Sequence, residues 1–326
     1  METYDITIIG AGPSGMFAAF YAGMRGAKTK IIDTLPQLGG QLATLYPEKY
    51  IYDIPGYNKI KAGDLVQNLE KQLMTFNHRY CLEQEVLKIE KLEDGSIEIT
   101  TNQDTHYSKS VILALGSGSF HPRKLALTSA PAFENLGIDY YVHDLMKYAG
   151  KKVAVAGGGD SALDWALMLE PIAAEVSLIH RRTNFRGHEH TVAKLMASSV
   201  NVMTPFVIEE CHGDHQLNRL VLKNPQEEET VDLAVDYLLV NYGFTSNLAI
   251  KDWGIDGSRR GIPVHSDMQT SIPGIYACGD IALYAGKVKL IATGFGEAPT
   301  AVNNALHYLN PKNRTQPGHS TSLFNE

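Results

Sequence analysis

Residues 153–165 read VAVAGGGDSALDW, and residues 6–18 read ITIIGAGPSGMFA. In each stretch an apolar run typical of a strand leads into a glycine-rich turn, and the residues after the turn are typical of a helix. Glycines in this pattern permit a tight turn, a close backbone approach to a pyrophosphate and a helix N-terminus that faces the phosphates. One such turn is weak evidence, because it also joins strands to helices without a ligand. Two of them in one chain indicate two dinucleotide-binding units.

The residue at the end of the second strand distinguishes the two units. Asp33 lies 23 residues after Gly10, where an acid accepts hydrogen bonds from the ribose of an adenine nucleotide. The same count from Gly157 reaches His180, which opens the stretch HRRTNFR. Guanidinium groups suit a 2′-phosphate, which a carboxylate would repel. We therefore expect FAD at the first unit and NADPH, in preference to NADH, at the second, with a solvated basic face as the alternative for the arginines.

The predicted contacts follow from these two turns. For FAD they are Gly10, Gly12, Pro13, Ser14, Gly15 and Asp33; for NADPH they are Gly157, Gly158, Gly159, Asp160, Ser161, His180, Arg181, Arg182 and Arg186.

A further strand, in TSIPGIYACGD (residues 270–280), ends at Asp280. Together with the two turns, this carboxylate is expected near the ribityl chain of FAD, although considered alone it is more typical of a helix cap or turn residue. We predict a last helix from about Pro299 to Leu309, whose N-terminus near Glu297 and Ala298 would face the flavin and stabilise negative charge on the reduced ring.

The order of strands and helices predicts an α/β fold with two Rossmann-like domains, the second inserted into the first. Strands that end in glycine near residues 116 and 243 are the expected crossing points. The predicted FAD domain comprises residues 1–116 and 244–326, and the predicted NADPH domain comprises residues 117–243.

Composition narrows the functional class. The 326 residues carry a formal net charge of −7, which argues against a nucleic-acid partner. The sequence has no apolar run of about 18 residues and no signal-peptide pattern, so we expect a cytoplasmic protein without membrane contact. Cys81, Cys211 and Cys278 form no CxxC pair and no zinc-ligand spacing, so no metal site is predicted.

Several motifs together resemble the low-molecular-weight thioredoxin reductases: GAGPSG, PQLGGQL, ILALG, GGGDSALDWAL, HRRTNFR, ACGD and GFGEAPTAVNNA. The stretches LYPEKYIYD, GGGDSALDWALMLEP and HSTSLF make the chain more similar to the thioredoxin-reductase-like (type 2) ferredoxin–NADP reductases, over essentially its whole length. True thioredoxin reductases carry a CxxC before the second glycine turn, where this chain reads GIDYYVHDLMKYAGKKVAV. A flavin here is therefore expected to pass its electrons directly to an acceptor.

The resemblance implies hydride transfer between NADPH and FAD, then one-electron transfer to ferredoxin or flavodoxin, in a homodimer. It implies that Tyr46 stacks on one face of the flavin and His319 on the other, with the tail HSTSLF reaching the flavin of the partner subunit. No residue is expected to act as a nucleophile or as a general acid or base. The further FAD contacts that the resemblance implies are Gln41, Val86, Phe120 and Thr321.

Two other functions stay open at this point. An NADPH oxidase or diaphorase that reduces oxygen, quinones or free flavins would have the same sequence features. A non-enzymatic nucleotide sensor would bind both cofactors without turnover. A set of basic residues, Lys287, Lys289, Lys312 and Arg314, suits attraction of an acidic ferredoxin, although scattered surface lysines are common.

Overall fold

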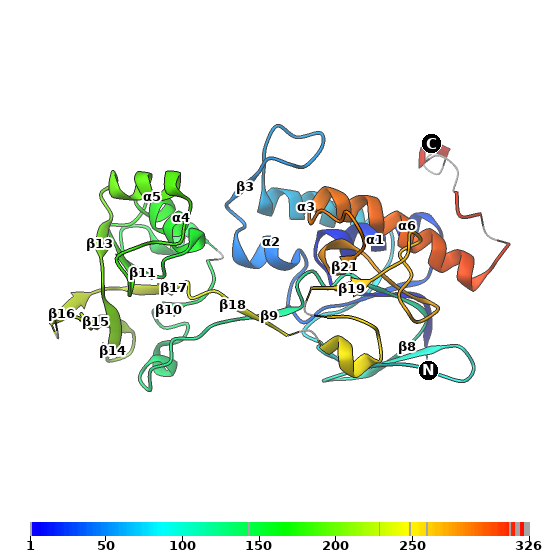
Figure 1. The fold of residues 1–326 in the computed structure, drawn as a ribbon, viewed down its shortest axis with the longest axis horizontal. Coiled ribbons are helices and arrows are strands. Elements are labelled where there is room, and N and C mark those ends of the chain that lie inside the picture. The colour runs from blue at the N-terminus through cyan, green and yellow to red at the C-terminus, as the bar shows by residue number, and fades with distance from the viewer. Residues whose placement is uncertain are drawn as a thin grey trace. The chain divides into compact units, whose positions relative to one another are not determined.

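The computed structural model describes residues 2–142, 144–227, 229–247, 249–258, 260–312, 314–316 and 320–322. The chain forms two compact units: unit 1 comprises Met1–Phe120 and Ser246–Glu326, and unit 2 comprises His121–Thr245 (Figure 1). The chain crosses between them twice, at strands that pair with each other, β9 (Ser119–Pro122) and β18 (Phe244–Asn247).

Unit 1 is built on a sheet whose central strands run in the order β5-β2-β1-β8, with β20 beside the end of β8. All of these pairs are parallel. The first half of β8 pairs instead with an antiparallel hairpin, β6 and β7. The bounds are β1 Thr3–Ile9, β2 Thr29–Ile32, β5 Arg79–Cys81, β6 Val86–Lys91, β7 Ile97–Thr101, β8 Thr105–Leu113 and β20 Ile275–Ala277.

Three helices cover one face of this sheet: α1 (Pro13–Met24), α3 (Ala62–Leu73) and α6 (Ile291–Leu309) (Figure 1). Alternate strand residues decide the face: Ile8 packs among the helices, whereas Ile9 faces the β6–β7 hairpin and the 3₁₀ segment Ala249–Trp253 on the other side. The short elements of unit 1 are α2 Gly40–Leu45, β3 Tyr50–Ile51, β4 Ile60–Lys61, β19 Ile262–Pro263, β21 Ala282–Leu283 and the 3₁₀ segments Gly279–Ile281 and Ser320–Ser322.

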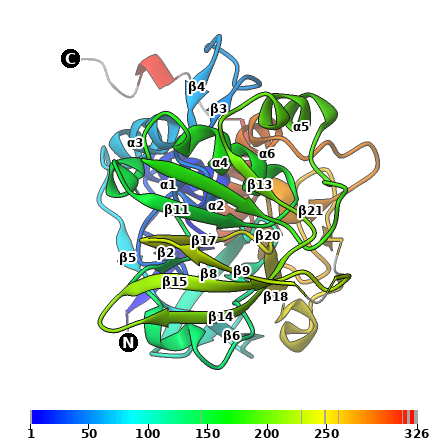
Figure 2. The same ribbon diagram turned by 90° about the vertical axis from the view of Figure 1, so that its left-hand side faces the viewer.

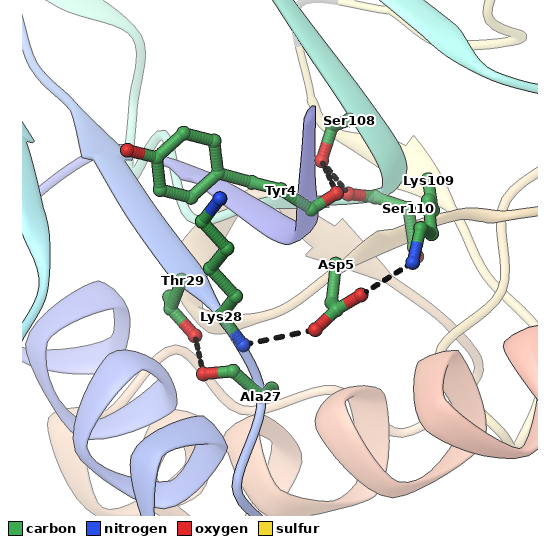
Figure 3. A network of polar contacts seen from close by, with 8 residues as sticks. All are labelled: Tyr4, Asp5, Ala27, Lys28, Thr29, Ser108, Lys109 and Ser110. Atoms are coloured by element: carbon green, nitrogen blue, oxygen red, sulfur yellow. Dashed lines mark hydrogen bonds and ion pairs between the residues drawn. The ribbon is translucent and has the colours of Figure 1, made fainter. Parts of the chain in front are cut away.

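A polar network holds the amino-terminal edge of this sheet (Figure 3). The Asp5 carboxylate accepts hydrogen bonds from the backbone N–H of Lys28 at 3.0 Å and from Nζ of Lys109 at 2.8 Å. Burial raises the pKa of Asp5, but these bonds outweigh burial and hold the pKa below its usual value. These bonds tie β1 to β8 and to the residue before β2. They support the strand register in which Ile9 pairs with Ile32 and Leu113 at the carboxyl ends of the strands.

Unit 2 has a fully parallel sheet in the order β10-β17-β11-β12-β13. Figure 2 labels its strands β11, β13 and β17. Helices α4 (Asp160–Leu169) and α5 (Glu189–Met196) lie on one face, where Trp165 is buried. The antiparallel sheet β14-β15-β16 covers the other face. The bounds are β10 Ile138–Asp139, β11 Lys152–Ala156, β12 Glu175–Ile179, β13 Asn201–Met203, β14 Val207–Gly213, β15 Leu217–Lys223, β16 Thr230–Ala234 and β17 Tyr237–Val240, with 3₁₀ segments Ala130–Phe133 and Leu145–Tyr148.

The parallel runs β5-β2-β1-β8 and β13-β12-β11-β17 both follow the 3-2-1-4 order of a Rossmann fold, so the predicted α/β fold is confirmed. None of the helices in the described part of the chain combines the length and the apolar character needed to cross a bilayer.

The prediction for the last helix was wrong at its start. Helix α6 begins at Ile291 and contains Pro299, so Glu297 and Ala298 lie inside the helix and not at its N-terminus. The glycines before Pro299 belong to the helix, and Gly294 serves close packing: a Cβ there would lie 2.1 Å from Oγ of Ser14. The helix dipole therefore starts at Ile291, and the role assigned to Glu297 and Ala298 at a helix end is withdrawn.

Candidate functional site

The first glycine turn leaves open space at one position and none at another. A Cβ on Gly12 would meet no atom within 4 Å, whereas a Cβ on Gly15 would lie 1.9 Å from the carbonyl oxygen of Gly10. The start of α1 thus packs directly on the turn, as the third glycine of this motif allows. The open side at Gly12 leaves room for a pyrophosphate to approach the backbone.

Asp33 ties this turn to the end of β2. Its Oδ2 accepts a hydrogen bond from the backbone N–H of Ala11 at 2.5 Å, and its Oδ1 accepts one from Leu35 at 2.8 Å. Burial raises the pKa of Asp33 above its usual value, although the backbone donors Ala11, Leu35 and Thr34 work against burial. The predicted ribose-binding carboxylate therefore also orders the turn.

One cavity of unit 1 brings most of the predicted FAD contacts together. It is lined by Gly10, Gly12, Pro13, Ser14, Asp33, Gln41, Tyr46, Val86 and Asp280. Gly15 lies below the turn and does not line the cavity.

Helix α2 places Gln41 and Tyr46 in this cavity. The helix starts against the glycine turn, because the N–H of Gly39 donates to the carbonyl of Ala11 at 2.9 Å. Tyr46 follows the last turn of α2, and its pKa is raised by burial and by the nearby charge of Asp280. The ring of Tyr46 and the carboxylate of Asp280, which are far apart in the sequence, thus line the same cavity.

A buried ion pair supports the turn before Asp280. The side chains of Lys287 and Glu297 are 3% and 5% exposed and bond to each other. Glu297 Oε2 accepts from the N–H of Gly279 at 2.8 Å, and Lys287 Nζ donates to the carbonyl of Gly279 at 3.1 Å. Tyr284 OH donates to Glu297 Oε1 at 2.6 Å. Both backbone polar groups of Gly279 are therefore held by this pair, which fixes the turn at the cavity wall.

This arrangement corrects the interpretation of Lys287 as a surface charge for ferredoxin. Its ammonium is buried and paired, so it presents no charge to an approaching protein. Lys289, Lys312 and Arg314 are exposed.

The cavity also contains residues that sequence reasoning missed. Most of them directly precede or follow a predicted residue in the sequence, or follow the end of β8, so the carboxyl ends of the strands were the available signal. They are Ile9, Ile32, Thr34, Leu35, Gly40, Leu42, Gln84, Glu85, Ala114, Leu115, Gly116, Gly118, Trp253, Gly279 and Ile291. Trp253 and Ile291 had no such signal.

The second glycine turn lies at the end of β11. A Cβ on Gly159 would meet nothing within 4 Å, which repeats the open position of Gly12. Asp160 begins α4, and its Oδ1 accepts from the N–H of His188 at 2.8 Å. Because the N–H of Arg186 also donates to the carbonyl of Gly158 at 2.7 Å, the segment that carries the arginines is anchored to the turn.

His180 lies against the middle of this turn. A Cβ on Gly158 would come within 2.2 Å of the His180 ring, which also stacks on Phe185 at 5.3 Å between centroids. Burial lowers the pKa of His180, and the neighbouring arginines lower it further against a backbone hydrogen bond of Asn184 that raises it. Arg181, Arg182, Arg186 and Ser161 are exposed around the same end of the sheet.

Two buried polar atoms at this edge have no hydrogen-bond partner among the described residues: Nε2 of His180 and Nδ2 of Asn241. Asn241 follows β17, and its carbonyl oxygen would lie 2.6 Å from a Cβ on Gly157. Strands β12 and β13 lie on one side of β11 and β17 on the other, so Asn241 stands where the strand order reverses. Ligands of such sheets bind at that place, and the sequence had not pointed to Asn241.

The remaining predicted flavin contacts lie near the C-terminus or at the first crossing between the units. Phe120 belongs to β9, but its side chain is outside the described part, as is the whole of His319. Thr321 is exposed in the 3₁₀ segment Ser320–Ser322 and does not line the cavity of its own chain. Among the described residues no group of His, Cys, Asp or Glu could hold a metal ion.

The three cysteines are free and buried. Burial raises the pKa of the Cys211 thiol to about 11 and that of Cys278 to about 12. At neutral pH these thiols are protonated, and a protonated thiol is a poor nucleophile.

Comparison with known proteins bears on both units. Residues 4–305 match the pyridine nucleotide-disulphide oxidoreductase family. A protein of Enterococcus faecalis named ferredoxin–NADP reductase is 61% identical and covers 99% of this chain and 97% of its own length. One of Bacillus subtilis, named ferredoxin–NADP reductase 2, is 57% identical, with 99% and 98% covered. The solved thioredoxin reductase of Lactococcus lactis in its FR conformation is 28% identical, with a TM-score of 0.73 and 94% and 99% covered.

These matches confirm the resemblance that the motifs indicated, and they agree with the strand order of both sheets. The chain therefore belongs to the pyridine nucleotide-disulphide oxidoreductase family, whose members use FAD and NADP(H), and within it to the group of ferredoxin–NADP reductases with a thioredoxin-reductase-like fold.

Proposed function

We propose that this protein is an FAD-dependent ferredoxin (flavodoxin)–NADP reductase. One observation carries the proposal: a cavity with an acid at its glycine turn occurs in the same chain as a second glycine turn surrounded by exposed arginines. The names of relatives that are 55–61% identical support it.

The cavity of unit 1 fits FAD on its own geometry. Gly12 offers open backbone at the cavity wall for the pyrophosphate, and Asp33 stands at the strand end where the adenosine ribose would bind. When bound, FAD supplies the capacity to accept a hydride from NADPH and to release electrons singly. Tyr46 would stack on the ring, Asp280 would hold the ribityl chain, and Gln41 and Val86 would complete the contacts.

Unit 2 is the proposed NADPH domain. Arg181, Arg182 and Arg186 would bind the 2′-phosphate, and the buried atoms of His180 and Asn241 that lack partners would find them on the nucleotide. We propose domain boundaries near residues 116 and 243, with residues 117–243 as this domain.

The tail and the partners complete the proposal. His319 and Thr321 would act at the flavin of a second subunit in a homodimer, and Phe120 would contact FAD. The chain holds no CxxC, and its three cysteines are buried, so the electrons would leave for a separate carrier, ferredoxin or flavodoxin. We propose that this occurs in the cytoplasm.

Anaerobic stopped-flow mixing tests the function. The FAD-loaded protein is mixed with NADPH and then with oxidised ferredoxin or flavodoxin, and the visible absorbance of the flavin is followed. Rapid bleaching and rapid recovery on addition of the carrier are expected. Recovery only with oxygen, quinones or free flavins would replace the proposal with an oxidase or diaphorase, and the absence of bleaching would leave a nucleotide-binding sensor.

A further inference from the structure

A buried chain of polar side chains leads from the interior of unit 1 to the cavity. Lys30 on β2 and His106 on β8 are 4% and 6% exposed, and Nζ of Lys30 lies 3.1 Å from Nδ1 of His106. Nε2 of His106 lies 2.7 Å from Oε1 of Gln84, and Gln84 lines the cavity. Burying a lysine costs free energy, so an apolar residue at position 30 would be the simpler choice for stability alone.

The lysine decides which nitrogen of His106 carries the proton. An ammonium group donates hydrogen bonds and accepts none, so Nδ1 of His106 must accept and Nε2 must carry the hydrogen. Burial and the charge of Lys30 both lower the pKa of His106, which agrees with a neutral ring. Lys30 itself is held over the ring of Tyr4, 4.3 Å from its centroid (Figure 3 shows Tyr4).

The fixed tautomer in turn fixes the amide of Gln84. Nε2–H of His106 donates to Oε1 of Gln84, and Oγ1 of Thr101 lies 3.1 Å from the same oxygen. The carbonyl side of the amide is thereby engaged, which leaves the NH₂ group as what Gln84 offers to the cavity.

The main chain shows which end of the cavity this is. The N–H of Gln84 donates to the carbonyl of Asp33 at 2.9 Å, and the N–H of Asp33 donates to the carbonyl of Cys81 at 3.1 Å. Gln84 therefore adjoins the carboxylate at the end of β2, where the adenosine of a dinucleotide is bound. Adenine nitrogens and ribose oxygens are acceptors suited to an amide NH₂.

We propose that the side-chain NH₂ of Gln84 binds the adenosine half of FAD, and that His106 and Lys30 are positioning residues that point it there. The inference rests on the proposed FAD site. Gln84 touches the cofactor; His106 holds the Gln84 amide in one orientation, and Lys30 holds His106 in one tautomer.

Cofactor binding to the apoprotein tests the role of Gln84. Gln84→Glu keeps an acceptor for His106 and Thr101 but removes the NH₂, so the dissociation constant for FAD should rise about tenfold, the effect of one hydrogen bond of ordinary strength. The dissociation constant for FMN, which lacks adenosine, should stay within about twofold. Gln103→Ala is the matched control, because Gln103 bonds to the carbonyl of Glu83 in the same segment and does not line the cavity. Its FAD affinity should be unchanged.

The positioning residues are tested by a pair of variants. His106→Gln can accept from Lys30 and donate to Gln84, so it should bind FAD nearly as the parent does, whereas His106→Leu should weaken FAD binding about as much as Gln84→Glu. Lys30→Met should also weaken it, while urea unfolding of the apoprotein shows no loss of stability.

Equal weakening of FAD and FMN, or parental FAD affinity in Gln84→Glu, would overturn the inference. A parent apoprotein that binds no FAD would instead contradict the proposed function, so the two failures are distinguishable.

Discussion

The two glycine turns differ in how the neighbouring strand end holds them. In unit 1 the carboxylate of Asp33 accepts a hydrogen bond from the backbone of Ala11 in the middle of the turn. In unit 2 the ring of His180 lies flat against the equivalent residue, Gly158, so closely that a Cβ there would overlap it. The Asp33 carboxylate bonds only the backbone N–H of residue 11, so an alanine side chain fits there. The His180 ring covers residue 158, so only glycine fits at that position. The residues at the middle position, alanine in GAG and glycine in GGG, therefore reflect which side chain lies against each turn.

The third small residue of each motif, Gly15 in unit 1 and Ala162 in unit 2, also depends on what lies beside it. Gly15 has the carbonyl of Gly10 where its Cβ would be, whereas unit 2 carries Ala162, whose Cβ would lie 2.8 Å from a Cβ on Gly157. The helix of unit 2 thus leaves the turn with room for one methyl group. The two units share a motif but differ in how closely helix and turn approach.

Exchanging the small residues Gly15 and Ala162 should have the largest effect, on the free energy of unfolding. Gly15→Ala places a methyl group on the backbone of Gly10 and should lower the free energy of unfolding of unit 1 by about 3 kcal/mol, the upper range for overpacking. Ala162→Gly should cost unit 2 about 1 kcal/mol, the usual cost of a glycine in a helix. Urea unfolding of the full-length apoprotein measures both values.

Each unit carries its own reporter for this experiment. The chain has two tryptophans, Trp165 in unit 2 and Trp253 in unit 1, so Trp253→Phe and Trp165→Phe variants let fluorescence follow one unit at a time. Equal costs for the two exchanges would mean that the two helices approach their turns equally.

The arginines of unit 2 provide the next largest effect. Arg181→Ala with Arg182→Ala should lower kcat/KM for NADPH about 100-fold, because each charged hydrogen bond contributes about 1.5–3 kcal/mol, and should leave NADH within about twofold. Steady-state reduction of ferricyanide by each nucleotide is the measurement. Arg219→Ala with Lys223→Ala removes the same charge from the antiparallel sheet of unit 2 and is the control. Equal losses with both nucleotides would disprove 2′-phosphate recognition.

The sequence was sufficient to locate a feature wherever its pattern lay within one strand, turn and helix. Both turns, the acid Asp33 and the arginine segment after His180 are local patterns, and the count from each first glycine located the strand end. Asp280 was located from its place at a strand end together with the two turns, whereas Gln41 and Tyr46 came from the family resemblance. Composition and periodicity alone would not have joined them.

The sequence was insufficient where a residue's role depends on a distant partner. Lys287 was interpreted as a surface charge, because no nearby sequence pattern indicates that it forms a buried ion pair with Glu297. The start of α6 was misjudged because Gly294 serves the contact with Ser14, which lies 280 residues earlier in the chain. Lys30, His106 and Gln84 come from three separate segments, and only the folded sheet brings them together.

A double-mutant cycle tests the explanation of GAG and GGG. Gly158→Ala should destabilise unit 2 by about 2 kcal/mol, because the new Cβ overlaps the His180 ring. In a His180→Ala background the same change should cost less than about 0.5 kcal/mol, which gives a coupling of about 1.5 kcal/mol. Unfolding followed at Trp165 provides the four values.

The matching cycle in unit 1 is the control for this interpretation. Ala11→Gly and Asp33→Ala should show little coupling, since Asp33 contacts only the backbone N–H of residue 11. Additive effects in unit 2 would assign the glycine at position 158 to another cause, such as nucleotide approach.

The smallest expected effect is the response of unit 2 to pH. Burial, with the arginines, holds the pKa of His180 below the ordinary histidine value of 6.5, so the folded state binds fewer protons than the unfolded state just below that pH. The stabilising contribution is complete above pH 6.5 and is lost as the pH falls through the lowered pKa. The urea midpoint followed at Trp165 should therefore decrease as the pH is lowered from 7.5 to 5.5, and His180→Gln should flatten that slope.

Unit 1 is the control. The slope at Trp253 should persist in this variant, because burial also lowers the pKa of His78 and His106 in unit 1. If His180→Gln left the Trp165 slope unchanged, the imidazole would be free to ionise in the folded protein, and its close fit over Gly158 would not be what keeps it neutral.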